Sequence, residues 1–133
     1  MKPEELKYAK THEWVYVYEG GAGERIARVG ISAFAVEALT DLVYIELPPI
    51  GKEVASGKPF GEIESVKAVS DLYSPVTGKV IAVNQDLPGD LSVLNRDPYE
   101  VGWLVEIELA KGEALSGLLD YPAYQKQCAE EGH

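Results

Sequence analysis

The sequence is poor in the residues that most often build metal centres. It has one cysteine, Cys128, and two histidines, His12 and His133, at opposite ends of its 133 residues. A single cysteine excludes a disulfide within the chain and a cysteine-based metal site. Two histidines this far apart do not form a ligand cluster of recognisable spacing. We therefore expect neither a disulfide scaffold nor a metal centre.

Catalytic motifs are also missing. Ser/His/Asp catalysis needs a histidine in the body of the fold, and only His12 qualifies, without a Gly-x-Ser-x-Gly elbow. There is no glycine-rich loop of the P-loop or dinucleotide-binding type. Glu62 and Glu64 lie on one face of a predicted strand, which is more typical of a solvated surface than of a catalytic pair. The sequence therefore favours a protein that is not an enzyme.

Basic residues and long apolar runs are scarce as well. Twelve Lys and Arg stand against 22 Asp and Glu, a net charge of −10 that repels phosphate backbones, so we expect no nucleic acid partner. The apolar runs are too short to span a membrane. The first residues, Met-Lys-Pro-Glu-Glu, resemble neither a secretory signal nor a transit peptide. We expect a cytoplasmic protein, or a mature chain whose leader has been removed, which would place it in the mitochondrial matrix.

The sequence does contain many short strand-like segments. A chain of 133 residues fits a single domain, residues 1–133. Segments rich in aliphatic and aromatic residues predict strands, with a glycine-rich hairpin tip at 19–23, a short strand within 51–57 and bends or bulges within 60–66 and 72–83. The main predicted strands are 14–18, 25–31, 42–47, 58–64, 71–76, 78–83 and 103–109.

Helical patterns are few and short. Ser32 is placed to cap a helix over 33–39, and the irregular stretch 84–98 is predicted to be a loop with one helical turn. Apolar spacing beyond residue 112, with Leu115, Leu118 and Leu119 on one face, predicts C-terminal helices over about 112–130. The fold class is therefore mostly β: a sandwich or partly closed barrel with a core over about 14–109, an N-terminal hairpin, one short internal helix and a helical tail.

One lysine has an unusual position. Lys67 lies between two predicted strands, near the turn of a hairpin, where its ammonium stays in water and within reach of another protein's active site. A covalent attachment point requires this placement. Spacing alone does not separate it from the other eight lysines.

The sequence resembles the H proteins of the glycine cleavage system over nearly its whole length. Six separate blocks occur in the family's order. The blocks are Thr11-His12-Glu13-Trp14, Gly30-Ile31-Ser32, Asp41-Leu42-Val43-Tyr44-Ile45-Glu46-Leu47-Pro48, Phe60-Gly61-Glu62-Ile63-Glu64-Ser65-Val66-Lys67-Ala68, Ser70-Asp71-Leu72-Tyr73-Ser74-Pro75-Val76, and Asp97-Pro98-Tyr99 with Gly102-Trp103-Leu104.

The resemblance implies a lipoyl carrier with a barrel-sandwich hybrid, or lipoyl-domain-like, fold. Lys67 would carry lipoic acid, joined through an amide by a lipoate-attaching enzyme. In this family, glycine decarboxylase, a pyridoxal-phosphate enzyme, transfers an aminomethyl group to the lipoyl arm. Aminomethyltransferase then passes the carbon to tetrahydrofolate, and dihydrolipoamide dehydrogenase reoxidises the dithiol. The cofactor supplies the chemistry, so the carrier needs no catalytic residues.

The resemblance also implies a cleft in which the loaded arm rests. Glu13 and Asp71 fall at positions that line this cleft in the family, where a carboxylate can pair with the arm's ammonium. The chain departs from the family pattern at Ala38, where several relatives carry a histidine facing the arm. It departs again at Pro88-Gly89-Asp90, where relatives more often have an acidic helical turn.

Three alternatives stay open at this point. The first is a lipoyl or biotinyl module of another complex, although such modules are shorter and biotinyl domains usually place methionine on both sides of their lysine. The neighbours here are Val66 and Ala68. The second is an H-like protein that relays lipoate to other lipoyl-dependent complexes. The third is a structural homologue that is never modified.

Overall fold

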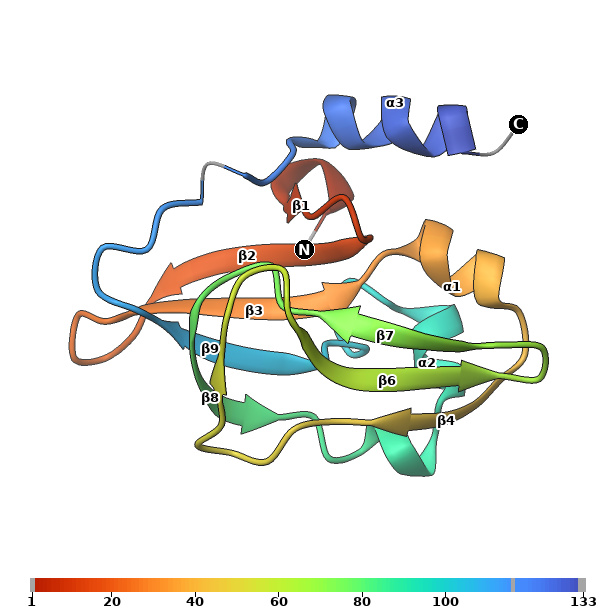
Figure 1. The fold of residues 1–133 in the computed structure, drawn as a ribbon, viewed down its shortest axis with the longest axis horizontal. Helices are drawn as coiled ribbons and strands as arrows, with labels where there is room; N and C mark the ends of the chain where they lie inside the picture. Colours follow the sequence, from red (N-terminus) through yellow and green to blue (C-terminus); the bar gives the residue numbers. More distant parts are fainter. Residues whose placement is uncertain (1, 116, 132–133) are drawn as a thin grey trace.

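The fold consists of two antiparallel β-sheets (Figure 1). The structure, a computed structural model, describes residues 2–115 and 117–131. The larger sheet has the order β1-β2-β3-β9-β8-β5, and the smaller has the order β4-β6-β7. The strands are β1 (Lys7–Tyr8), β2 (Glu13–Glu19), β3 (Arg25–Ile31), β4 (Leu42–Glu46), β5 (Glu53–Val54), β6 (Pro59–Ser65), β7 (Val69–Tyr73), β8 (Gly78–Val83) and β9 (Val105–Leu109).

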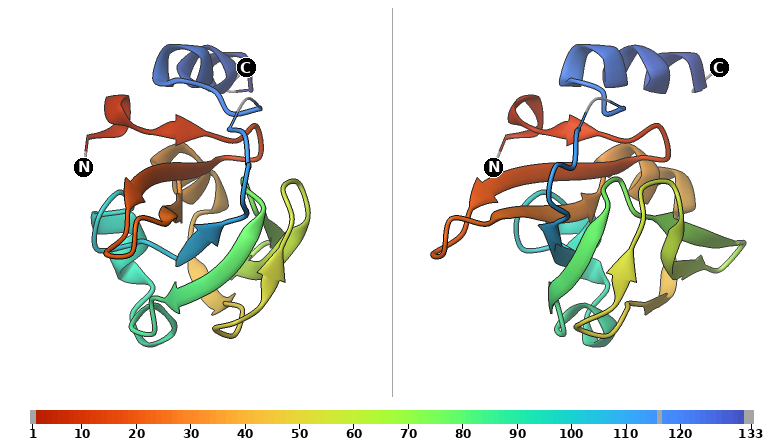
Figure 2. Two further views of the ribbon diagram at one scale, coloured as in Figure 1. Left: turned by 90° about the vertical axis from the view of Figure 1, so that its left-hand side faces the viewer. Right: turned by 60° about the vertical axis from the view of Figure 1, so that its left-hand side comes forward.

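Helices cover the ends of the sheets. They are the α-helices α1 (Ala33–Leu39), α2 (Ser92–Arg96) and α3 (Tyr121–Glu131), with 3₁₀ turns η1 (Pro3–Glu5) and η2 (Leu87–Gly89). Ser32 caps α1, because its Oγ accepts a hydrogen bond from the Ala35 amide at 3.3 Å. All views show α3 lying across β1, on the side of the molecule away from the smaller sheet (Figures 1 and 2).

The main core lies between the two sheets. Inward-facing side chains alternate with outward-facing ones along the strands, so each sheet presents one apolar face. Val29 and Ile107 come from the larger sheet, while Ile45, Ile63 and Leu72 come from the smaller one, and all five are buried.

A second apolar cluster fixes α3 to the sheet. It consists of Leu6, Tyr8, Trp14 and Tyr124. The rings of Tyr8 and Tyr124 stack with centroids 4.2 Å apart. Trp14 lies against Gly30 on the neighbouring strand, where an added Cβ would come within 2.3 Å of the indole ring. Only glycine leaves room for the indole there, and this ties β3 to the cluster beneath α3.

Most of the predicted elements are confirmed. The hairpin of β2 and β3, the Ser32-capped helix, the strand before Pro48 and the short strand within 51–57 are all present. Register shifts occur between Pro59 and Gly61 and between Val80 and Ala82, inside or beside the segments where bulges were expected. The mostly β fold class is confirmed.

The helical prediction needs correction in the C-terminal tail. The helical tail is a single helix that begins at Tyr121, whereas residues 112–115 and 117–120 are not helical; residue 116 lies outside the described residues. Leu119 instead bridges Tyr8, with N–H···O distances of 2.7 and 2.8 Å in the two directions, so its backbone groups are satisfied by β1 rather than by a helix. The helical turn expected within 84–98 is confirmed, because α2 covers the five residues Ser92–Arg96. Among the described helices, none has the length and apolarity needed to cross a membrane.

Candidate functional site

Lys67 lies at the tip of the hairpin formed by β6 and β7. Its side chain is exposed, and in Figure 1 this tip projects from the edge of the molecule. The last paired residues of the two strands are Glu64 and Val69. The predicted position of Lys67 at a hairpin turn is therefore what the structure shows. Its neighbour Val66 is 72% exposed, so the tip offers an apolar contact beside the amine.

Ser65 closes the hairpin and fixes its shape. Its amide donates to the Ala68 carbonyl at 2.8 Å, and its Oγ accepts from the Ala68 amide at 3.2 Å. The Ser65 hydroxyl thus accepts the hydrogen bond that a backbone carbonyl would accept in a regular ladder. The Val66 amide donates to the Asp41 carbonyl at 2.9 Å, which anchors the tip to the start of β4. A lysine side chain mounted on this tight turn can move freely while its backbone is held.

A cavity of about 210 Å³ lies beside the hairpin. Its walls come from the turn before β2 and the first residue of that strand, from the end of β3, from α1, and from β6 and β7. Glu131, at the end of α3, also lines it. Ser70 and Asp71 belong to the β7 wall. They follow Lys67 by only three and four residues, a path of about 10–13 Å at the rise of a strand. A lipoyl-lysine side chain has a comparable reach, so the residues present fit such a group.

Both sequence-predicted acids line this cavity, and they differ in burial. Asp71 is exposed and lies opposite Glu62 across the β6–β7 ladder. Glu13 is 1% exposed. Its Oε1 accepts a short hydrogen bond from the Thr11 hydroxyl, and its Oε2 accepts one from the Tyr73 amide at 3.2 Å. Glu13 therefore connects the β2 side of the cavity to β7.

Burial makes Glu13 a weak acid. Desolvation raises the pKa of its carboxyl group to about 7, and the hydrogen bonds from Thr11 and Tyr73 offset part of this shift. A carboxyl group in this state can take a proton when the cavity is empty. It can ionise when a cation enters, because an opposite charge favours the carboxylate form.

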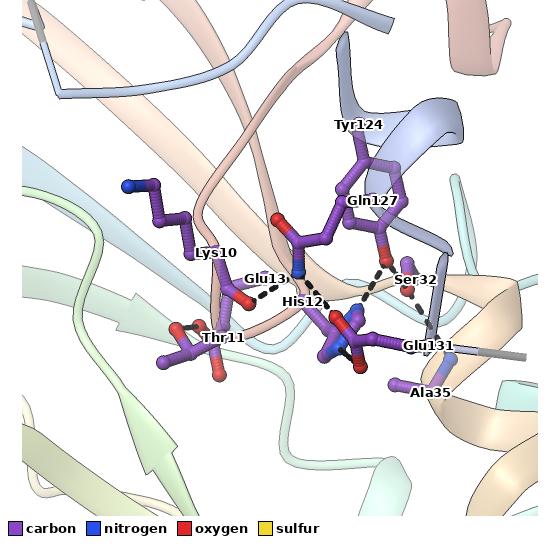
Figure 3. Close-up of polar contacts among 9 residues, drawn as sticks. All are labelled: Lys10, Thr11, His12, Glu13, Ser32, Ala35, Tyr124, Gln127 and Glu131. Carbon is purple, nitrogen blue, oxygen red and sulfur yellow. Dashed lines mark hydrogen bonds and ion pairs between the residues drawn. The ribbon is translucent and has the colours of Figure 1, made fainter. Parts of the chain in front are cut away.

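Glu131, at the end of α3, lines the cavity, and Figure 3 shows it beside His12. His12 lies between α3 and the cavity, and its Nδ1 is 2.7 Å from the Tyr124 hydroxyl while its Nε2 is 3.0 Å from Glu131. Its ring also stacks on Phe34 of α1, with centroids 5.2 Å apart. The sequence pattern around His12 did not predict a role for this side chain. No local pattern could reveal these contacts, since Tyr124 and Glu131 are more than 110 residues away along the chain.

The two places where the sequence departs from the family pattern differ in their position relative to the cavity. Ala38 lines it, on the α1 wall. Pro88-Gly89-Asp90 forms the turn η2 and the residue after it, outside the cavity lining. A larger hollow of about 540 Å³ lies along β5 and the ends of β8 and β9, and no residue of the Lys67 hairpin lines it. Within residues 2–115 and 117–131, no three His, Cys, Asp or Glu side chains gather in a way that could hold a metal ion.

A two-sheet antiparallel fold with an exposed lysine at a hairpin tip defines a lipoyl-domain-like protein. The profile described as glycine cleavage H-protein matches residues 6–131. The chain belongs to this family.

Individual relatives agree with the family match. The chain is 54% identical over 130 residues to a glycine cleavage system H protein of Rhodopirellula baltica, covering 98% of this chain and 97% of the relative. It is 49% identical over 131 residues to one of Mycolicibacterium smegmatis, covering 96% and 97%. Its fold matches the crystal structure of a glycine cleavage system H protein from Mycobacterium marinum, with a TM-score of 0.86, 38% identity and coverage of 96% and 99%.

Proposed function

We propose that this chain is the lipoyl carrier of a glycine cleavage system and is not itself catalytic. It would carry the aminomethyl group of glycine from glycine decarboxylase to aminomethyltransferase, and electrons to dihydrolipoamide dehydrogenase, on a lipoyl group at Lys67. The observation that carries the proposal is the exposed lysine on a backbone-fixed hairpin tip, in a chain that belongs to the H-protein family.

The lipoyl group, when bound through an amide to Lys67, supplies the reversible disulfide chemistry. The chain's own residues do the rest. Ser65 holds the tip so that the Lys67 amine faces solvent, where a lipoate-attaching enzyme and the three partner enzymes can reach it. Because Lys67 is exposed, its side chain is free to turn from one partner to the next.

The cavity is the proposed resting place of the arm. It lies within reach of Lys67, and its walls combine apolar surface from Phe34 and Leu72 with carboxyl groups from Glu13 and Asp71. Apolar surface suits the hydrocarbon part of the arm, and carboxylates suit an ammonium at its end. Closing the arm into this cavity would remove water from its end.

Intact-mass measurement tests the attachment site. Protein produced with lipoate and a lipoate ligase should gain one lipoyl group, and Lys67→Arg should gain none. Lys58→Arg is the matched control, because Lys58 is also exposed and immediately precedes β6, the same hairpin's first strand. If Lys67→Arg were lipoylated as fully as the protein without a substitution, the assignment would be overturned.

A second measurement tests the glycine cleavage role. Lipoylated protein mixed with glycine decarboxylase should support exchange of labelled carbon dioxide into glycine. If no exchange occurred while the same enzyme was active with another H protein, the glycine cleavage role would be excluded. The lipoate relay would then remain.

A further inference from the structure

The end of α3 contributes a carboxylate to the cavity. Glu131 is the last described residue of this helix and lines the cavity. Its carboxylate accepts two hydrogen bonds, from His12 Nε2 at 3.0 Å and from the Gln127 amide at 2.6 Å. Since Glu131 is 119 residues from His12 along the chain, only the docking of α3 brings it here.

A chain of hydrogen bonds holds this end of α3 in place (Figure 3). The Ser32 Oγ accepts from the Ala35 amide, and it lies 2.5 Å from the Tyr124 hydroxyl, which in turn lies 2.7 Å from His12 Nδ1. Gln127 also donates to the Lys10 carbonyl at 2.8 Å. Through Tyr124, Gln127 and Glu131, α3 is therefore bonded to the N-cap residue of α1 and to the turn before β2. Both α1 and this turn are cavity walls.

The network assigns one direction of donation for the neutral imidazole. If Ser32 donates to Tyr124 and Tyr124 donates to His12 Nδ1, then Nε2 carries the proton and donates to Glu131, and every group is satisfied. The reverse direction would place an unprotonated Nε2 against the carboxylate, which repels it. Burial raises the pKa of Tyr124, so its hydroxyl keeps the proton that it donates.

The same contacts keep Glu131 ionised. The hydrogen bond from Gln127, followed by that from His12, lowers the pKa of Glu131. His12 adopts a φ of 82°, in the left-handed region that few non-glycine residues occupy. This backbone conformation occurs in the turn that places His12 between the cavity and α3.

We infer that Glu131 is a charge-selecting residue of the cavity, and that His12 positions it. The inference rests on the proposed function, because it assumes that the arm on Lys67 enters this cavity. Glu131 adds a carboxylate to those of Glu13 and Asp71. It thereby favours an arm that ends in an ammonium over a neutral arm of the same size.

Two alkylated forms of the lipoylated protein test this selectivity. The reduced arm is alkylated with 2-bromoethylamine, which adds an ammonium, or with 1-bromopropane, which adds a neutral group of the same length. All variants carry Cys128→Ala, because Cys128 would otherwise react too. The readout is the NMR chemical shift of the Ala35, Ala38 and Ser70 amides. Their changes relative to the unlipoylated protein report what fraction of each arm occupies the cavity.

We expect the ammonium arm to occupy the cavity more than the propyl arm, and Glu131→Gln to reduce this preference about two- to five-fold. Glu130→Gln, an exposed neighbour outside the cavity lining, should leave the preference unchanged. His12→Ala should reduce the preference as Glu131→Gln does, and His12→Gln, which keeps a donor, should restore part of it.

The outcomes separate this inference from the proposed function. An unchanged preference in Glu131→Gln would overturn the inference. So would an equal decrease in cavity occupancy for both arms, because it would mean that Glu131 only shapes the cavity wall. Failure of both arms to enter the cavity, in the protein that carries Cys128→Ala alone, would also overturn it. Lipoylation and carbon dioxide exchange are measured separately, so the carrier role can stand when the inference falls.

Discussion

The tip around Lys67 and the cavity beside it are built in opposite ways. The tip comes from consecutive residues 65–68, and residues 66–68 are exposed. The buried Ser65 side chain closes it. The cavity draws on segments from residue 11 to residue 131, and its lining includes fully buried side chains such as Glu13 and Leu72. The tip can therefore be altered with little effect on the fold, whereas the cavity shares its walls with the core.

This difference suits a carrier. A group that visits several enzymes needs an attachment point free of tertiary contacts. A resting place that excludes water needs walls held from several directions. The following three changes test the contrast, from the largest expected effect on stability to the smallest.

Leu72→Ala should destabilise the protein strongly, whereas Val66→Ala should not. Leu72 is 1% exposed, lies in the main core and lines the cavity, so its truncation should cost about 2–5 kcal/mol of unfolding free energy. Val66 is 72% exposed at the tip, and its truncation should change that free energy by less than about 0.5 kcal/mol. Urea unfolding of both variants measures the two values. Similar losses would contradict the contrast.

Glu13→Gln should remove a pH dependence that belongs to the cavity. The folded-state pKa of Glu13, about 7, lies above its ordinary value of 4.5. The stability associated with its protonation is therefore fully present below about pH 4.5 and is lost as pH rises through about 7. From pH 5 to pH 8, the free energy of unfolding of the protein without a substitution should fall by at most about 3 kcal/mol relative to that of Glu13→Gln.

Denaturant unfolding of both proteins at several pH values measures this difference. Glu130→Gln is the matched control, since the same change at an exposed acid should leave the pH dependence as it is. Parallel pH profiles for Glu13→Gln and the unmodified protein would show that burial of Glu13 does not shift its titration.

Tyr124→Phe should weaken the attachment of α3 moderately. The change removes the hydroxyl that bonds to both Ser32 and His12. The fully buried Ser32 hydroxyl then keeps the hydrogen bond from the Ala35 amide but loses its bond to Tyr124. We expect a loss of about 1–2 kcal/mol in the free energy of unfolding. Tyr121→Phe on the same helix removes a hydroxyl bonded only to the exposed Gln125, and its effect should be within about 0.5 kcal/mol. Equal effects would mean that the buried network does not hold the helix.

Local sequence patterns predicted the tip and most strands because those features depend on near neighbours. A glycine-rich segment between two strands predicted the hairpin of β2 and β3, and Ser32 predicted the start of α1. The position of Lys67 between two strand-like runs predicted an exposed turn. The resemblance to the H proteins then singled out Lys67, Glu13 and Asp71, and the last two do line one cavity.

Local patterns were wrong where long-range pairing competes with helix formation. Leu115, Leu118 and Leu119 have helical spacing, yet Leu119 pairs with Tyr8 of β1, more than 100 residues away. Spacing along the chain does not show which distant strand offers free backbone groups. The helix therefore begins only at Tyr121.

The sequence by itself determined the strand-rich architecture, the hairpin lysine and the membership of a family. Only the tertiary structure decided that Glu13 is buried and a weak acid, and that His12 and Glu131 meet at the cavity. The physical reason is that burial, desolvation and hydrogen bonding depend on which surfaces meet after folding. For the cavity, those surfaces come from opposite ends of the chain.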